Sequence, residues 1–477
     1  GVGTTRNLTI QNTPAAVTIA HSVLWFQGTA TAPALGCTNI VVKNTNIQGN
    51  GNLGGASGTT TYSTGIVFVG TTAASSTTLG ANHDNITISN NLIKRVTNGI
   101  HMGNAIATPI TNLIIQNNEI GSALAAEAVY YRGMWLSNIS GAIIRGNHIF
   151  NIVPTLSTQS LDRMGIELAG TGSSNNLIEK NNIHGLATYG TSGYGGYGIN
   201  INGGNNHSVI NNLIYDIQGY GWTSQANCPE GIRLSAGTGH KVYYNSVHLY
   251  GQVTGTTTRY SAAFVVAATT VTGIDVRNNI FSNQMTAPNS TTTENMVMWF
   301  AASYNFATAG NTISNNGLFL TPASANHIVG KVGTTLGSGN STSLSAWQTA
   351  SSGDVNSVPS TSQLAPFTSN TNLTIPVSTN TPLESGGIAI VSLGLPNTDY
   401  TGTNRPAGTG LSPDIGAYEF EGIGAGGCTA PPTPGTATAT PNSGICPGAT
   451  IVLDLSGASG GIGQTYQWQS SATSGSG

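Results

Sequence analysis

A recurring asparagine constrains the fold of this chain more than any other feature of its sequence. It stands between an apolar pair and a further Ile, Val or Leu, as in residues 114–120, which read IIQNNEI. The repeat is found at Asn91, Asn118, Asn147, Asn181, Asn212, Asn245, Asn278 and Asn316, at intervals of 27 to 38 residues. Periods of this length are typical of solenoids, so we predict one solenoid coil per repeat.

A second pattern in the same coils indicates a parallel β-helix. A glycine is followed by an apolar, a variable and an apolar residue at positions 65–68, 99–102, 133–136, 165–168, 198–201 and 231–234. Short alternating runs of this kind favour strands, and no helical pattern of roughly 10 to 15 residues separates them. We therefore predict an all-β, right-handed parallel β-helix. The asparagines are expected to adopt left-handed backbone at the bends and to bond to each other from coil to coil.

Composition excludes two classes of function. Only 31 of the 477 residues are charged, or 6%, against roughly 25% in ordinary domains, and the formal net charge is −3. A protein that tracks nucleic-acid phosphates needs clustered Lys and Arg, so nucleic-acid binding is not expected. The longest weakly polar run, residues 262–274, is shorter than the ~20 apolar residues of a spanning helix, so membrane insertion is not expected either.

The cysteines and histidines predict neither a metal site nor a cofactor. No CxxC, HxH or HExxH spacing occurs, and the histidines at 148, 184, 207, 240 and 248 are expected at differing positions of the coil. Cys428 and Cys446 are a disulfide candidate, which would imply an oxidising compartment. Cys37 and Cys228 are expected to be unpaired.

After residue 341 the asparagine repeat stops and three motifs follow. They are Ala-Trp-Gln at 346–348, Asp-Val-Asn-Ser at 354–357, and Arg-Pro at 405–406 with Asp-Ile-Gly-Ala-Tyr-Glu-Phe at 414–420. In this order they resemble the C-terminal closing segment of secreted bacterial right-handed β-helix proteins, a fold shared with pectate lyases. The resemblance implies parallel β-helix coils over residues 1–341 and a closing segment over residues 342–421.

The remaining residues resemble a different kind of domain. Residues 422–444 are rich in Gly, Ala, Thr and Pro and are expected to form a linker. Residues 445–453 and 465–470 resemble the opening of the Ig-like repeats on very large surface proteins of Bacteroidota, which are exported by the type IX secretion system. Such a sandwich needs about 100 residues, so residues 445–477 are expected to be only its start. The resemblance implies an extracellular, cell-surface location and carries over no catalytic residue.

The variable position of the glycine pattern predicts an outward column of side chains. Strand side chains alternate between the two faces, so the column contains Val67, His101, Trp135, Glu167, Asn200 and Arg233. With a rise of ~4.8 Å per coil, Glu167 and Arg233 are expected roughly 10 Å apart. An aromatic ring beside polar groups suits a sugar, so we predict ligand binding at His101, Trp135, Glu167, Asn200 and Arg233, with Tyr197 beside them. The alternative is a column of ordinary solvent-facing residues.

Catalysis at this column is a second hypothesis. Hydrolysis of a glycosidic bond needs two carboxylates, and a lyase needs a base beside a cation. Candidates for these roles are Glu167, Arg233, Arg132 and Glu230. Isolated surface ion pairs would give the same pattern, and the motifs of pectate lyases and polygalacturonases are not found.

The sequence therefore favours a non-enzymatic, adhesin-like segment of a large secreted cell-surface protein that binds polysaccharide on an outward strand face. A polysaccharide lyase or glycoside hydrolase is one alternative, and a non-binding spacer of a surface fibre is another. The expected partners are polysaccharide and the type IX secretion or cell-surface machinery.

Overall fold

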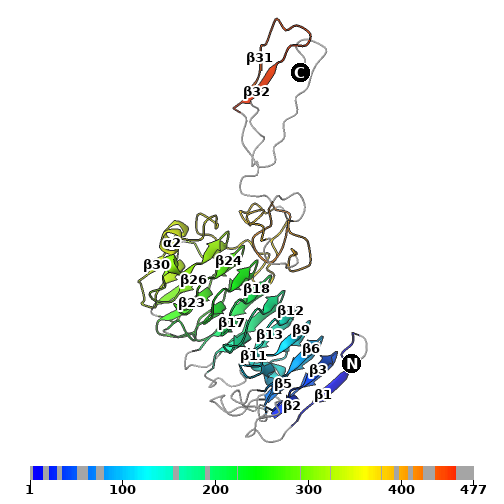
Figure 1. Cartoon of the computed structure of the whole chain (residues 1–477). Coiled ribbons are helices and arrows are strands. Elements are labelled where there is room, and N and C mark those ends of the chain that lie inside the picture. Colours follow the sequence, from blue (N-terminus) through cyan, green and yellow to red (C-terminus); the bar gives the residue numbers. More distant parts are fainter. Residues whose placement is uncertain are drawn as a thin grey trace.

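A computed structural model shows how the repeats stack (Figure 1). It describes residues 4–13, 21–29, 35–50, 63–70, 80–153, 161–188, 194–222, 224–290, 292–322, 324–377, 379–390, 397–406, 412–422 and 436–457. Successive coils pair in parallel on three faces, so the predicted parallel β-helix is confirmed, while its right-handed sense stays a prediction.

Among the described residues, the first face is a nine-stranded parallel sheet with one strand from each of nine successive coils. Its strands are β3 (Thr38–Lys43), β6 (Asp84–Ser89), β9 (Thr111–Gln116), β12 (Ile143–Arg145), β15 (Leu177–Glu179), β18 (Ser208–Ile210), β21 (Lys241–Tyr243), β24 (Asp275–Arg277) and β27 (Thr312–Ser314).

The second face follows the asparagine bend in each coil. Its strands are β1 (Leu8–Gln11), β4 (Thr45–Gln48), β7 (Leu92–Lys94), β10 (Glu119–Ile120), β13 (His148–Ile152), β16 (Asn182–Leu186), β19 (Leu213–Ile217), β22 (Ser246–Leu249), β25 (Ile280–Asn283) and β28 (Gly317–Leu320).

The third face contains the glycine pattern. Its strands are β2 (His21–Gln27), β5 (Ser63–Val69), β8 (Val96–Gly103), β11 (Val129–Ser137), β14 (Arg163–Ala169), β17 (Gly196–Asn202), β20 (Glu230–Leu234), β23 (Arg259–Val266), β26 (Thr293–Phe300) and β29 (His327–Val332). One turn of 3-10 helix, η1 (Ala125–Glu127), precedes β11, and the short helix α1 (Phe306–Ala309) follows β26.

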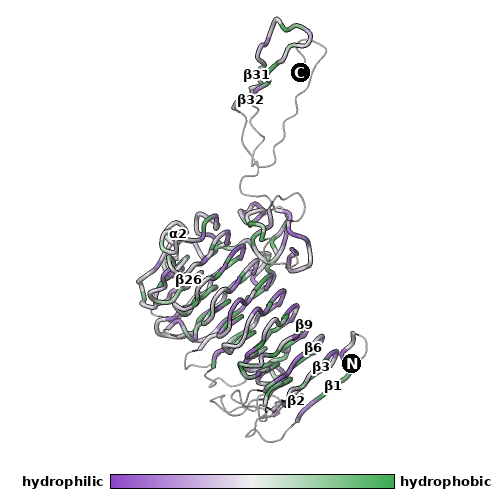
Figure 2. The backbone as a smooth tube through the Cα atoms, viewed as in Figure 1, coloured by the Kyte–Doolittle hydropathy of each residue, from purple (hydrophilic) through white to green (hydrophobic). Residues whose placement is uncertain are grey.

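One continuous apolar core fills the space between the three faces. It is a stack of Ile, Val, Leu, Met and Phe side chains that extends from Val42 to Trp347. Figure 2 shows hydrophobic and hydrophilic residues alternating along the stacked strands. The glycine that opens the third-face pattern is required by close packing, because a Cβ on Gly99 would lie 2.5 Å from the Gly133 oxygen of the next coil.

The asparagine ladder lies at the corner between the first and second faces. In each rung the backbone N–H and the side-chain Nδ2 of one asparagine both donate to the Oδ1 of the asparagine in the next coil. For Asn181 and Asn212 both distances are 3.0 Å. The rung in the seventh of these coils is Asn279 rather than the predicted Asn278. Asn278 is instead the preceding residue, which adopts left-handed backbone with φ 59°.

Ladder bonding and left-handed backbone are thus separate roles, held by adjacent residues. We predicted both for a single asparagine, and that prediction is wrong. The left-handed position takes several residue types, such as Gly146, Lys180 and Tyr244. The neighbouring position, whose side chain forms the ladder, is an asparagine in every coil from Asn91 to Asn316.

A second ladder, at the corner that leads into the first face, contains histidines. The backbone N–H of Asn176 donates to Nδ1 of His207, and that of His207 donates to Nδ1 of His240, each at 3.3 Å. On the second face, His184 and His248 share another recurring position, in register through Tyr215. The expectation that the histidines take differing positions is therefore wrong for these two pairs.

The end of the solenoid is closed by helix α2 (Leu344–Ser351), which follows the antiparallel β29–β30 hairpin, with β30 at Asn340–Ser341. Trp347 of α2 is fully buried and packs into the end of the core. The Ala-Trp-Gln motif is therefore the plug of the last coil.

The Asp-Val-Asn-Ser motif ends the asparagine ladder. Asp354 Oδ1 accepts from Asn316 Nδ2 at 3.0 Å, and Ser357 Oγ accepts from the Asn316 backbone N–H at 2.9 Å. The other Asp354 oxygen, Oδ2, accepts from the Trp347 indole at 2.5 Å. A carboxylate suits this place because every group that faces it is a donor.

The rest of the closing segment folds back along the outside of the second face. Leu383 and Ile415 pack on Ile280 and Phe319, and Leu373 and Ala417 pack on Leu213 and Tyr215. The segment therefore covers the strands of the later coils as well as following the last one (Figure 1).

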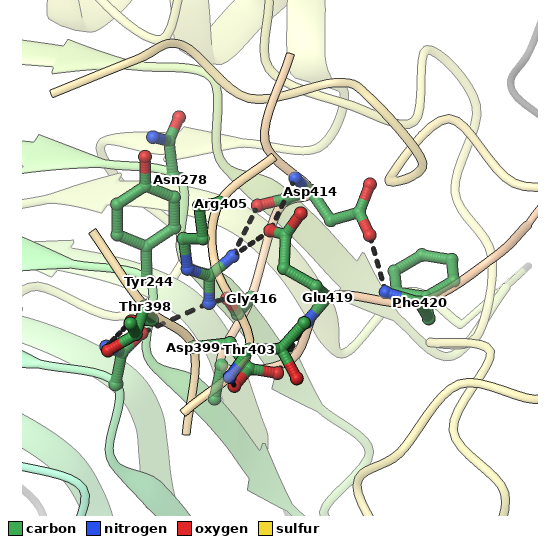
Figure 3. A network of polar contacts seen from close by, with 12 residues as sticks. Tyr244, Asn278, Thr398, Asp399, Thr403, Arg405, Asp414, Gly416, Glu419 and Phe420 are labelled. Atoms are coloured by element: carbon green, nitrogen blue, oxygen red, sulfur yellow. Dashed lines mark hydrogen bonds and ion pairs between the residues drawn. The ribbon is translucent and has the colours of Figure 1, made fainter. Parts of the chain in front are cut away.

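Arg405 fastens this segment to the solenoid (Figure 3). Its buried guanidinium pairs with Glu419, donates to Asn211 Oδ1 at 3.1 Å and to the Gly416 oxygen at 2.8 Å, and lies 4.1 Å from the ring centroid of Tyr244. Asp414 accepts the backbone N–H groups of Ser385 and Phe420, each at 2.7 Å. The third motif is therefore a polar clamp.

The last described strands, β31 (Thr436–Thr440) and β32 (Val452–Ser456), form an antiparallel pair. β31 lies inside the range that we predicted as a linker. Residues 465–470, which carry part of the resemblance to Ig-like repeats, lie outside the described residues, as does Cys428 of the disulfide candidate. Cys446 is exposed.

Candidate functional site

The predicted column lies in register on the third face. Val67 pairs with His101, His101 with Trp135, Trp135 with Glu167, Glu167 with Asn200, and Asn200 with Arg233. The register continues through Val265 and Trp299 to Lys331. Glu167 and Arg233 are thus two coils apart, with Asn200 between them.

Most of the column is buried, which differs from the expected open surface. His101, Glu167 and Asn200 are only 3%, 4% and 5% exposed, and Val67 is fully covered. Residues of the loop before β20 contribute to this cover, since the Arg233 guanidinium donates to the Gln225 carbonyl oxygen at 2.9 Å. The column is therefore not an open groove.

Trp135 has neighbours on its ring system that leave little room for a sugar. The His101 ring stacks on it with centroids 4.2 Å apart and an interplanar angle of 5°. The Arg132 guanidinium lies 4.1 Å from the ring centroid and pairs with Glu167. Glu167 is on β14 and His101 is on β8, the two strands that flank the strand of Trp135. We infer that the two ring faces are both occupied by the protein's own side chains.

The candidate catalytic residues are paired with one another. Arg132 Nε lies 2.7 Å from Glu167 Oε2. Arg233 donates to both oxygens of Glu230, at 2.8 and 2.9 Å, and to Ser235 Oγ at 2.9 Å. Hydrolases and lyases need a carboxylate or base that reaches the substrate, and these carboxylates face arginines inside the protein.

Tyr197 belongs to the same buried cluster and does not line an open cleft. It is 4% exposed, its hydroxyl donates to Asp162 Oδ2 at 3.0 Å, and that hydroxyl accepts from the Asn227 backbone N–H at 2.8 Å. Burial raises the pKa of Asp162 to about 6 and that of Glu230 to about 7. A raised pKa is typical of catalytic acids, but Glu230 is fully buried and paired with Arg233, and the partly exposed Asp162 accepts from Tyr197 and from the Gly195 backbone N–H.

A partly exposed hollow that the sequence did not indicate lies on the closing segment. Its volume is about 410 Å³, within the usual range of ligand pockets. Tyr418 and Phe420 contribute partly exposed rings, and the other lining residues are Thr374, Ile375, Val377, Thr403, Glu419 and Glu421. Rings, hydroxyls and a carboxylate meet there in one concave surface.

Sequence patterns could not reveal this hollow because its parts are far apart in the chain. Residues 374–377, 403 and 418–421 come together only when the closing segment folds back and the clamp at Arg405 forms. The motif at 414–420 indicated that a closing segment is present, but it did not indicate how this segment folds or that it forms a hollow.

Neither a metal site nor a membrane span is found in the part of the chain that the structure describes. No group of three or more His, Cys, Asp or Glu side chains there could hold a metal ion. No helix within the described ranges is long and apolar enough to cross a membrane.

The sequence matches no protein-family model and no curated protein at a significant level. Similar solved structures include XylC in complex with xylose, at 12% identity and a TM-score of 0.37, covering 76% of this chain and 65% of XylC. PfbA, a surface adhesin of Streptococcus pneumoniae, is 12% identical with a TM-score of 0.32, over 67% of this chain and 63% of PfbA.

Pectate lyase Pel9A is also similar, at 11% identity and a TM-score of 0.34, over 80% of this chain and 86% of Pel9A. The chain thus spans slightly less than two thirds of XylC and PfbA. The parallel β-helix assignment depends on the strand register of the chain itself, and these likenesses identify neither its activity nor its ligand.

Proposed function

We propose that this chain is a non-enzymatic, adhesin-like segment of a secreted cell-surface protein, and that it binds polysaccharide. The observation that carries the proposal is the hollow of about 410 Å³ in which the rings of Tyr418 and Phe420 meet the Thr374 and Thr403 side chains. An aromatic ring covers the apolar face of a sugar, and hydroxyls and carboxylates bond to its hydroxyl groups.

The internal pairing of the charged residues favours binding over catalysis. Glu167 faces Arg132 and Glu230 faces Arg233, so a lyase or hydrolase at the predicted column would first have to break a buried ion pair. The predicted column at His101, Trp135, Glu167, Asn200 and Arg233 is kept as an alternative location for the ligand.

The location and context of the protein are part of the same proposal. We infer an extracellular protein of Bacteroidota type, exported through type IX secretion, from the resemblance of its closing segment and C-terminal residues. We also propose that β31 and β32 belong to the start of an Ig-like sandwich. The neighbours PfbA, a surface adhesin, and XylC, solved with xylose, agree with this context without supporting a particular ligand.

The test is retention of the protein on immobilised polysaccharides, with new chain ends measured in parallel. Val377 is 74% exposed and lines the hollow, so Val377→Arg fills it without disturbing the core and should reduce retention at least tenfold. The matched control is Leu364→Arg, at a 51% exposed residue outside the hollow, which should bind like the wild type.

Other results would reject parts of the proposal. Loss of retention in Trp135→Ala but not in Val377→Arg would place the ligand on the predicted column. New chain ends that disappear in Glu167→Ala or Glu230→Gln would make the protein an enzyme. Absence of retention on every polysaccharide would favour the non-binding spacer.

A further inference from the structure

The hairpin that ends the solenoid brings a lysine, an asparagine and a glutamate into mutual contact. Lys331 of β29 and Asn340 of β30 are direct partners across the antiparallel pair. The Lys331 Nζ lies 2.8 Å from Asn340 Oδ1 and 3.0 Å from Glu294 Oε2. Asn340 Nδ2 lies 2.6 Å from Glu294 Oε1. One carboxylate therefore contacts both the amine and the amide nitrogen.

Two of these three groups are buried, and the third, Asn340, is partly exposed. Lys331 is fully buried and Glu294 is 4% exposed. Trp299, the strand partner of Lys331, and Tyr260, the strand partner of Glu294, belong to a buried apolar cluster. Burial of the amine and the carboxylate favours their reaction with a neighbouring amide, because water is kept from these two groups.

The hairpin loop fixes the position of the amine. The carbonyl oxygens of Thr335 and Ser338 each accept from Nζ at 2.8 Å, and the backbone N–H of Gly337 donates to Glu294 Oε1 at 2.8 Å. Nζ is thereby held beside the Asn340 side chain, whose amide carbon is one bond beyond the contacted oxygen. Holding the two reacting groups close together lowers the entropic part of the activation barrier of an intramolecular reaction.

We propose that Lys331 and Asn340 join in an intramolecular isopeptide bond, with Glu294 as the group that transfers the proton. Glu294 takes a proton from the Lys331 ammonium, and the neutral amine attacks Asn340 Cγ. The Nζ–Cγ bond forms, the Cγ–Nδ2 bond breaks, and Nδ2 leaves as ammonia.

The reaction balances without a further reactant. Of the three ammonium protons, one remains on the new amide, one leaves with the ammonia and one stays on Glu294. Nothing is oxidised or reduced. The product links the two strands of the terminal hairpin covalently, directly beside the plug formed by Trp347.

The first test is the mass of the purified full chain. Formation of the bond lowers the intact mass by about 17 Da, the mass of one ammonia molecule. A succinimide at an asparagine gives the same loss, so trypsin is the second readout. Trypsin cuts after a free lysine, and the peptides ending at 331 and beginning at 332 should remain joined when Lys331 is linked.

Variants test the assigned roles. Glu294→Gln keeps the shape of the side chain but removes the proton acceptor, so its mass should equal that of its sequence and trypsin should cut after residue 331. Lys94→Arg is the control, because Lys94 pairs with Glu127 at 2.6 Å outside this hairpin. This control should keep the mass loss and the joined peptide.

The wild-type protein alone decides the proposal if a variant fails to fold. An intact mass equal to that of the sequence, or a mass loss with normal cleavage after Lys331, overturns it and leaves a buried ion pair in the hairpin. Neither outcome depends on whether the protein binds polysaccharide.

Discussion

At the scale of single residues, the ladders depend on hydrogen-bond acceptors more than on amino-acid type. Along the first ladder the acceptor is an asparagine oxygen until Asp354 replaces it at the end. Along the second ladder, Nδ1 of His207 accepts a hydrogen bond from the backbone N–H of Asn176. In the same way, the side-chain oxygen of Asn176 accepts one from the backbone N–H of Ala142. A neutral imidazole and an amide are therefore interchangeable there, as long as the imidazole remains an acceptor.

Replacing Asp354 by asparagine should destabilise the end of the solenoid although the two side chains have the same shape. One oxygen becomes an NH₂ group that faces other donors, Asn316 Nδ2 or the Trp347 indole. A buried donor without an acceptor costs about 1 to 3 kcal/mol. Urea unfolding followed by Trp fluorescence measures the change. Asp84→Asn, at a residue with exposed partners, is the control, and an equal loss in both variants would contradict the argument.

His207 should make the protein sensitive to acid. Burial and the neighbouring His240 lower the pKa of His207 from 6.5 to about 4. The unfolded chain therefore binds a proton near pH 6.5 while the folded chain does not, so the stability from this group is lost as the pH falls from about 6.5 to about 4. At about 1.4 kcal/mol per pKa unit, the loss in the free energy of unfolding is on the order of 3 to 4 kcal/mol.

The variant His207→Asn isolates this contribution. Asparagine occupies the equivalent place at Asn176 and Asn311 and does not titrate in this range. The difference in unfolding free energy between wild type and variant should change in favour of the variant as the pH is lowered from 6.5 to 4. A difference that is independent of pH would contradict the assigned pKa.

At the scale of elements, each closing motif acts on a different part of the solenoid: Trp347 on the core, Asp354 on the ladder and Arg405 on the outer surface. Arg405 is the most demanding of the three, because its side chain is 1% exposed and it has several acceptors in a fixed geometry. Lysine has the same charge but lacks this planar fork of donors.

Arg405→Lys should loosen residues 397–406 and 412–420 while the strands beneath them stay protected. We expect the free energy of unfolding of this segment to fall by about 2 to 4 kcal/mol, because a lysine cannot keep the full geometry of the buried pair with Glu419. Hydrogen exchange measured by mass spectrometry locates the change. Arg145→Lys, in a pair whose arginine side chain is 43% exposed, should have little effect. Uniform loss of protection along the solenoid would contradict a local clamp.

The sequence allowed the register of the elements to be predicted, but not which of their surfaces would be covered. The alternation of Gly-Ile-Glu-Leu at 165–168 and its equivalents determined which side chains align, since strand side chains alternate. Cover over Arg233 comes from Gln225, in a loop whose path no strand pattern indicates. The hollow beside Tyr418 likewise depends on contacts between segments separated by more than forty residues. Local periodicity carries no information on such contacts.

At the scale of the whole molecule, stability depends on how the stack ends. A chain that stops at residue 341 loses Trp347 from the core and exposes Ile280, Phe319, Leu213 and Tyr215 on the second face. Exposed apolar surface of this extent drives association. We therefore expect oligomers by size-exclusion chromatography with light scattering, whereas a chain that stops at residue 422 should have the same association state as the full chain. Monomers from both would contradict a capping role.

The direction of the asparagine ladder has a consequence for the history of the molecule. Within the ladder, each asparagine donates to the Oδ1 of the asparagine in the following coil, and its own Oδ1 accepts from the asparagine in the preceding coil. Its Nδ2 also donates to a carbonyl oxygen of the preceding coil. Every internal coil therefore offers the same set of donors and acceptors to its two neighbours. A coil can then be copied or excised between two rungs while its neighbours still find matching partners. The length of the solenoid can thus change by whole coils, and only the carboxylate of Asp354 has to stay at the end of the ladder.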